Sequence, residues 1–216
     1  MNTDLTLFNQ VFPVACSYMG MKLDQVDDNL HSKSVSLFNE LMEYVAFKAY
    51  DLHISIEDIY RLTNLNPGDS ADFDFYLNDC KDSIIIASTL GIAVDNHSKK
   101  LQRTDLSGAI IYDALASSLL EHLTNIYEEE LNLGPHTFRF APGYGDIPLE
   151  INEIIIDALS LTKRIGINKT ADYLMLPQKS MITICGIGKT MAPVCGHCVR
   201  LNSCSLRKDN LRCYTN

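Results

Sequence analysis

Residues 139–150 constrain the fold of this chain more than any other segment. They hold Pro142, Gly143, Gly145 and Pro148 within seven positions. Proline fixes φ and lacks a backbone donor, while glycine favours conformations that other residues avoid, so neither a continuous helix nor a continuous strand can pass through. We therefore expect a shaped loop.

The flanks of this loop predict regular structure on both sides. Residues 136–140 carry the β-branched and aromatic side chains of a short strand, and Pro148 begins a run with helical spacing over about 149–164. A strand, a rigid turn and a helix in this order can present backbone groups and Tyr144 to a ligand, with Asp146 near the positive end of the following helix. From residue types alone, a tight connection without a ligand is equally acceptable.

Apolar spacing predicts the remaining elements. We expect helices over residues 23–52, 92–101 and 105–131, and strands over 53–60, 83–91 and 181–185. Residues 83–91 are apolar throughout, which is typical of a central strand buried on both faces. Residues 1–20 predict a short strand or turn near Pro13, and 64–72 a turn-rich connection. The predicted fold class is α+β, with long helices packed on a mixed or antiparallel sheet in residues 1–190 and a small Cys-rich appendage in residues 191–216.

Composition excludes some classes of partner. The chain has 216 residues, 46% of them hydrophobic, and a net charge of −9, which argues against nucleic acid. No run approaches eighteen apolar residues, and acids and amides occupy the N-terminus where a signal peptide carries basic residues. We expect a cytoplasmic protein that binds neither nucleic acid nor membrane.

The last 22 residues hold four of the seven cysteines, Cys195, Cys198, Cys204 and Cys213. Their C-x2-C-x5-C-x8-C spacing allows four thiolates to close around a tetrahedral zinc ion or a four-iron cluster. A tail of reduced thiols without metal is the alternative. The other three cysteines are scattered and suit core packing.

Arg139, Gly143 and Tyr144 form an Arg-x-x-x-Gly-Tyr pattern. This pattern resembles the S-adenosylmethionine-binding signature of the activation domain of cobalamin-dependent methionine synthase. The longer string over 139–149, followed by Met-Leu-Pro-Gln-Lys-Ser at 175–180, resembles the short, free-standing members of that family. The resemblance covers roughly the second half of the chain.

The resemblance implies binding roles for four loop residues, Arg139, Ala141, Gly143 and Tyr144. It also implies that a carboxylate on the preceding helix helps to hold the ligand. Glu128 is our choice for this role, with Glu121 and Glu129 as alternatives that the helical register leaves open. A solvated acidic face is the structural explanation for any one of them. Lys179 could reach an anionic group, although an exposed turn lysine is the simpler interpretation.

In the family, S-adenosylmethionine methylates a cobalamin that has received an electron from a reductase. This chain has no room for a corrinoid module, so the resemblance implies a reactivation subunit that acts on a separate corrinoid-binding methyltransferase subunit with an electron donor protein. The need for an electron favours an iron–sulfur cluster over zinc in the tail. No residue is assigned a catalytic role.

Two other functions remain open from the sequence. The chain could be a non-catalytic, metal-stabilised interaction module that has lost cofactor binding. It could also methylate a small molecule or a protein, but such a reaction requires a positioned base, and the sequence offers no convincing candidate.

Overall fold

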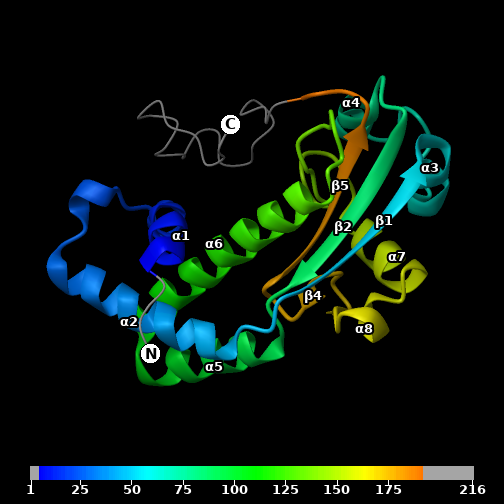
Figure 1. The fold of residues 1–216 in the computed structure, drawn as a ribbon. Helices are drawn as coiled ribbons and strands as arrows, with labels where there is room; N and C mark the ends of the chain where they lie inside the picture. The colour runs from blue at the N-terminus through cyan, green and yellow to red at the C-terminus, as the bar shows by residue number, and fades with distance from the viewer. Residues whose placement is uncertain (1–4, 192–216) are drawn as a thin grey trace.

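In the computed structural model, which describes residues 5–191, helices pack on both faces of a three-stranded antiparallel sheet (Figure 1). This arrangement confirms the predicted α+β class. The elements in chain order are α1 (Leu5–Tyr18), η1 (Leu23–Gln25), α2 (Asp28–Tyr44), β1 (Lys48–Ser55), α3 (Ile56–Thr63), α4 (Ala71–Leu77), β2 (Asp82–Thr89), α5 (Ile92–Thr104), α6 (Leu106–Glu130), α7 (Ile151–Ala158), α8 (Leu161–Arg164), β3 (Asn168–Lys169), β4 (Met175–Leu176) and β5 (Ser180–Ile187).

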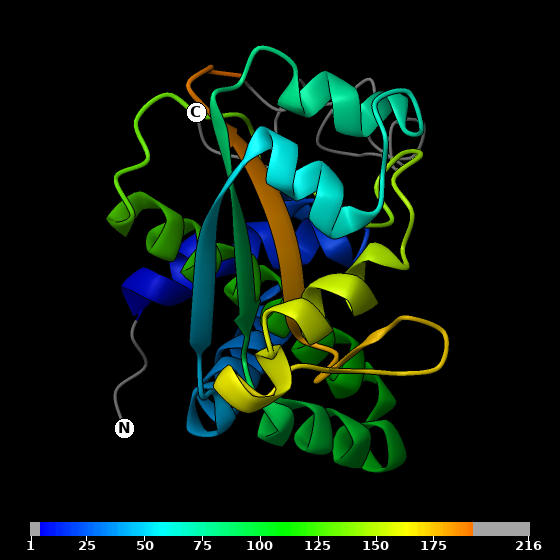
Figure 2. The ribbon, with the colours of Figure 1, turned by 90° about the vertical axis from the view of Figure 1, so that its right-hand side faces the viewer.

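Strand β2 lies at the centre of the sheet, between β1 and β5. Its side chains alternate between two cores: Ile84 and Ile86 face Tyr127 at the end of α6, whereas Ile85 packs with residues of α3, α4 and α7. Figure 2 shows α3, α7 and α8 on one face of the sheet and α6 on the other. Burial on both faces confirms the prediction for residues 83–91.

Helix α6 connects the sheet to a second layer of helices. Its C-terminal half lies against β2, and its N-terminal half packs against α1, α2 and α5 (Figure 1). The contacts of that second layer are apolar, with Phe8, Phe38 and Leu115 fully buried. The helix begins where Asp105 accepts a hydrogen bond from the Gly108 backbone N–H at 3.0 Å, which makes Asp105 its N-cap.

Two predicted elements near the first strand have different boundaries. The helix expected over 23–52 ends at Tyr44, and strand β1 follows it. The strand expected over 53–60 is wrong beyond Ser55, where α3 begins. The Ser55 hydroxyl accepts a hydrogen bond from the Asp58 backbone N–H at 3.1 Å, so this N-cap overrides the alternating pattern.

Two further predictions, for the segment near Pro13 and for residues 149–164, were wrong in part. The short strand or turn expected near Pro13 is part of helix α1, which buries Phe8, Val11 and Phe12. The single helix expected over 149–164 is divided into α7 and α8 by Ser160, whose φ of 51° interrupts the helical backbone.

The strand expected over 136–140 is reduced to isolated bridges, of which those of His136 and Phe140 go to β5 and that of Thr137 goes to Met191. Phe140 exchanges two backbone hydrogen bonds with Ile184, at 3.0 and 2.8 Å. At Thr137, however, the side-chain hydroxyl accepts the hydrogen bond from the Gly186 N–H, so the backbone ladder is not continuous.

None of the helices within residues 5–191 combines the length and apolar composition needed to cross a bilayer.

Candidate functional site

The loop over residues 139–150 is a series of turns, as its prolines and glycines predicted. The Tyr144 N–H donates to the Ala141 carbonyl at 3.0 Å, and the Ile147 N–H donates to the Tyr144 carbonyl at 3.0 Å. Gly143 and Gly145 have φ values of 86° and 58°, which residues other than glycine rarely adopt. The backbone of the loop is therefore held in one specific shape.

Aromatic packing fixes the loop to the domain. Phe140 is buried, and its ring stacks on that of Tyr76 in α4 with the centroids 4.8 Å apart. The half-buried ring of Tyr144 meets the same Tyr76 edge-on at 6.4 Å. Tyr144 thus stands where the loop passes from the core to the surface.

Asp146 lies at the start of α4, where its carboxylate forms its hydrogen bonds. Its carboxylate accepts hydrogen bonds from the Ser70 hydroxyl at 2.5 Å, the Ala71 N–H at 2.8 Å and the Asp72 N–H at 3.1 Å. The hydrogen bond from Ser70, together with those from the backbone, lowers the pKa of Asp146. These partners in α4 were not predicted from the sequence, because the two segments are 74 residues apart in the sequence.

Arg139 joins the loop to α6. Its side chain is 6% exposed, and Nη1 lies 3.0 Å from Glu128 Oε2. Nη2 donates to Asn125 Oδ1 at 2.5 Å and to Glu121 Oε2 at 3.3 Å. The structure thus brings together Arg139 and two of the three carboxylates considered from the sequence. Glu129 is exposed on the same helix.

The two carboxylates differ in their surroundings. The Glu128 side chain is 14% exposed, and its Oε1 lies 3.4 Å from both Cys185 Sγ and His136 Nε2. Burial raises the pKa of the Cys185 thiol, and the nearby Glu128 carboxylate adds to this effect. The Glu121 side chain remains 43% exposed, at the open end of the cluster.

Glu121 is the less tightly paired of the two carboxylates, 3.3 Å from Arg139 against 3.0 Å for Glu128. Partial burial raises the pKa of Glu121, the Arg139 guanidinium lowers it, and the Glu128 carboxylate raises it. Two carboxylates thus share one guanidinium, and the more accessible of the two has the weaker contact with it. A cationic group placed at Glu121 would be stabilised there.

Lys179 also contacts α6. Its side chain is 12% exposed and pairs with Asp113 Oδ1 at 2.7 Å and Ser117 Oγ at 2.8 Å, so it is not the exposed turn lysine that was the simpler prediction. Ser117 lies one helical turn before Glu121. The Pro-Gln-Lys-Ser turn therefore contacts the same helix as Arg139, nearer to its N-terminus.

Asp95 fixes the other side of this turn. The carboxylate is 2% exposed in the first turn of α5, and its Oδ2 accepts a hydrogen bond from the Gln178 N–H at 2.6 Å. Asp95 thus supports the structure through the turn at 177–180.

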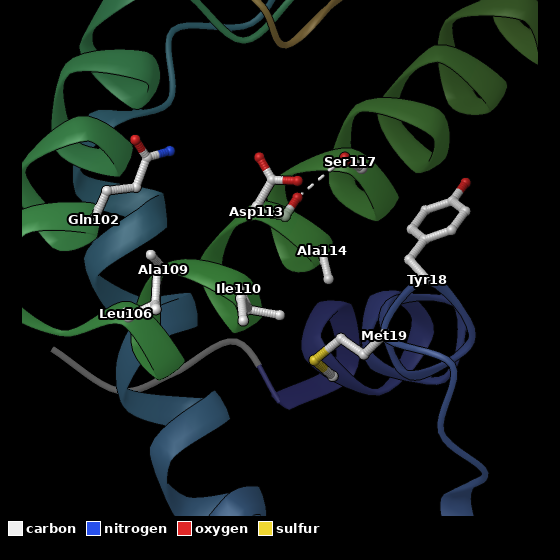
Figure 3. Close-up of a pocket in the computed structure, with 9 residues that line it drawn as sticks. All are labelled: Tyr18, Met19, Gln102, Leu106, Ala109, Ile110, Asp113, Ala114 and Ser117. Atoms are coloured by element: carbon white, nitrogen blue, oxygen red, sulfur yellow. Dashed lines mark hydrogen bonds between the residues drawn. The ribbon is translucent and has the colours of Figure 1, made fainter.

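A cavity of about 350 Å³ lies between α1, α5 and the first half of α6 (Figure 3). Asp113 and Ser117 form its polar wall, and Met19, Leu106 and Ile110 contribute apolar surface. It contains none of the predicted ligand residues. Ser117, which lines this cavity, lies one turn of α6 before Glu121.

The predicted metal ligands Cys195, Cys198, Cys204 and Cys213 lie outside the described residues. Within residues 5–191, no group of three histidine, cysteine, aspartate or glutamate side chains is placed to hold a metal ion. Cys16, Cys80 and Cys185 are free thiols, two of them buried.

Sequence reasoning missed Asn125 and the contact between Asp146 and Ser70. Asn125 follows Glu121 by one helical turn, so the α6 register, had it been fixed, would have predicted it. The Asp146 contact had no local signal, because its partners belong to a distant helix.

No protein-family model matches this sequence, and no curated protein matches it either. Among solved structures, the chain is similar to a crystal structure of the MetH reactivation domain bound to AdoHcy, with 18% identity and a TM-score of 0.46. The match covers 61% of this chain and 48% of the solved chain, so it spans about half the length of that structure. A likeness of this extent assigns neither ligand nor partner to this chain.

Proposed function

We propose that this chain binds S-adenosylmethionine between the loop at residues 139–150 and the second half of α6. The observation that carries the proposal is the cluster of Arg139, Glu121 and Glu128, in which a partly exposed carboxylate stands beside Arg139, the first residue of the Arg-x-x-x-Gly-Tyr pattern. The sequence pattern suggested the ligand, and the charge of the cluster supports it.

The chemistry of the ligand suits these groups. S-adenosylmethionine carries a sulfonium cation and an ammonium group, both of which favour carboxylate and carbonyl oxygens or an aromatic face. Glu121 offers the carboxylate, and the loop offers its carbonyl groups and the ring of Tyr144. The Arg139 guanidinium is buried in ion pairs with Glu121 and Glu128, so its role is to hold these two carboxylates in place. The backbone of Arg139 continues into the loop.

We further propose that the bound ligand serves the reductive methylation of a corrinoid on a separate methyltransferase subunit, with an electron donor protein. The corrinoid and S-adenosylmethionine supply the reactive groups of that reaction. The residues of this chain bind and orient the methyl donor, with the adenosine and amino-acid parts held so that the methyl group faces the partner.

Isothermal titration of the full 216-residue chain with S-adenosylmethionine tests the first proposal. We expect micromolar binding, about −8 kcal/mol. Glu121→Gln should weaken it at least tenfold because the charge is lost without a change in shape, and Tyr144→Ala should weaken it as well. Glu130→Gln is the matched control, since Glu130 is exposed on the same helix.

Two results would contradict the proposal. One is the absence of saturable binding to a folded sample. The other is an affinity for Glu121→Gln equal to that of Glu130→Gln. Either result would favour the alternative of an interaction module without a cofactor.

The tail supports a separate proposal, based on its spacing alone. We propose that Cys195, Cys198, Cys204 and Cys213 bind an iron–sulfur cluster or zinc. Metal analysis of anaerobically purified protein should find iron with acid-labile sulfide or one zinc per chain, and the double variant Cys195→Ser/Cys198→Ser should lose it. Metal-free protein with four titratable tail thiols would refute this assignment without affecting the ligand site.

A further inference from the structure

The loop and helix α4 cap each other through two aspartates. Asp146 of the loop accepts hydrogen bonds from Ser70, Ala71 and Asp72 at the start of α4. In return, Asp72 Oδ2 accepts a hydrogen bond from the Asp146 N–H at 3.1 Å. Charge-assisted hydrogen bonds of this kind are among the stronger ones in proteins. We call these four residues the α4–loop clamp.

Gly145 shows how closely the two segments approach. A Cβ atom at this position would lie 1.8 Å from Asp72 Oδ2, and the φ of 58° already favours glycine. Gly145 is the residue between Tyr144 and Asp146. The clamp therefore holds the backbone directly beside the aromatic ring that we assign to the ligand site.

Aromatic packing between α4 and the loop also holds the two segments together. Phe73 and Tyr76 of α4 are fully buried, and Phe73 meets Phe140 of the loop edge-on at 5.7 Å. Tyr76 contacts both Phe140 and Tyr144. A shift of α4 would thus displace the loop on its buried side as well as at the clamp.

We infer that Asp146 is a positioning residue of the ligand site, which fixes Tyr144 and the loop backbone by capping α4. Both of its carboxylate oxygens accept hydrogen bonds from the start of α4, so the role that we assign to Asp146 is to hold the loop against α4. Because linkage is reciprocal, ligand binding to the loop should in turn stabilise the first turn of α4. This inference rests on the proposed function of the loop.

Titration of the full chain with S-adenosylmethionine tests the positioning role. We expect Asp146→Ala to weaken binding about tenfold, which corresponds to about 1.4 kcal/mol. Asp146→Asn should restore part of the affinity, because its amide oxygen can still accept from the backbone N–H groups of α4.

Asp74→Asn is the matched control. Asp74 also belongs to the first turn of α4, but its carboxylate accepts hydrogen bonds from the Tyr60 hydroxyl and the Gly68 N–H, which precede α4. It should lower the melting temperature yet keep the affinity within twofold of the wild type. Equal losses of affinity in Asp74→Asn and Asp146→Ala would refute the inference, because general weakening of α4 would then explain both.

Hydrogen exchange without ligand separates this inference from the proposed function. Asp146→Ala should speed exchange at the amides of residues 143–147 and of 71–73, whereas Asp74→Asn should leave 143–147 unchanged. If the wild type does not bind S-adenosylmethionine, the proposed function fails, yet this experiment still decides whether Asp146 orders the loop. Unchanged exchange at 143–147 in Asp146→Ala would overturn the clamp.

Discussion

Replacing Arg139 with methionine tests whether the loop and α6 depend on a buried ion pair. Methionine fills much of the same space but leaves Glu128, at 14% exposure, without its cation. Breaking a fully buried pair costs about 3–5 kcal/mol. Because the Glu121 half of the cluster is 43% exposed and screened by water, we expect the lower end, about 3 kcal/mol at pH 7.

Thermal unfolding of the full chain, followed by circular dichroism, measures this loss. For a domain of this size, 1 kcal/mol shifts the melting temperature by about 2–4 °C, so Arg139→Met should lower it by about 6–12 °C. The double variant Arg139→Met/Glu128→Gln should recover at least half of the loss, because neither partner is then left charged and unpaired.

The pH dependence of the same variant follows from Glu121. Its pKa in the folded state lies above the ordinary value of 4.5, so protonation of Glu121 stabilises the fold at low pH and this contribution disappears as the pH rises. Arg139 opposes that shift. The destabilisation by Arg139→Met should therefore be larger at pH 7 than at pH 4.5. A loss below about 1 kcal/mol, or an equal loss in the Glu128→Gln background, would refute the reasoning.

Three further changes test other parts of the fold. Gly145→Ala should cost at least about 2 kcal/mol in urea unfolding, because the left-handed backbone strains alanine and the new methyl group meets Asp72; an unchanged midpoint would show that the clamp is not rigid. Ser160→Gly should stabilise the chain by about 1 kcal/mol, since Ser160 has a φ of 51° between α7 and α8, and a lower urea midpoint would contradict this. Asp105→Ala removes the α6 cap and the partner of Lys33. Hydrogen bonds from Lys33 and Gly108 lower the Asp105 pKa to about 2, so the contribution of Asp105 to stability is present above pH 3.8 and lost as the pH falls through 2. The melting temperatures of variant and wild type should therefore converge on acidification.

The sequence predicted those elements that are determined by residues close together in the chain. The helical spacing over 105–131 became α6, the apolar run at 83–91 became the central strand, and the prolines and glycines at 142–148 produced a loop. Each of these depends on residues within a few positions of one another. Ser55 was the exception, because an N-cap and an alternating pattern competed over the same residues and the cap prevailed.

Contacts between distant segments could not be predicted in the same way. The family resemblance assigned Arg139 and Glu128 to the ligand site, but it did not predict that they pair with each other. Spacing alone left the helix register open. The contact of Asp146 with α4 was not predicted because its partners Ser70 and Asp72 precede it by more than seventy residues. Such contacts depend on how α4 packs beneath the loop, which no local pattern encodes.

A crystal structure of the full chain grown with saturating S-adenosylmethionine tests the central claim most directly. We predict density for the ligand between Tyr144 and the second half of α6, with its ammonium or sulfonium group within about 4 Å of the Glu121 carboxylate. Density in the cavity beside Ile110, or none in either place at saturation, would contradict the assignment of the loop as the binding site.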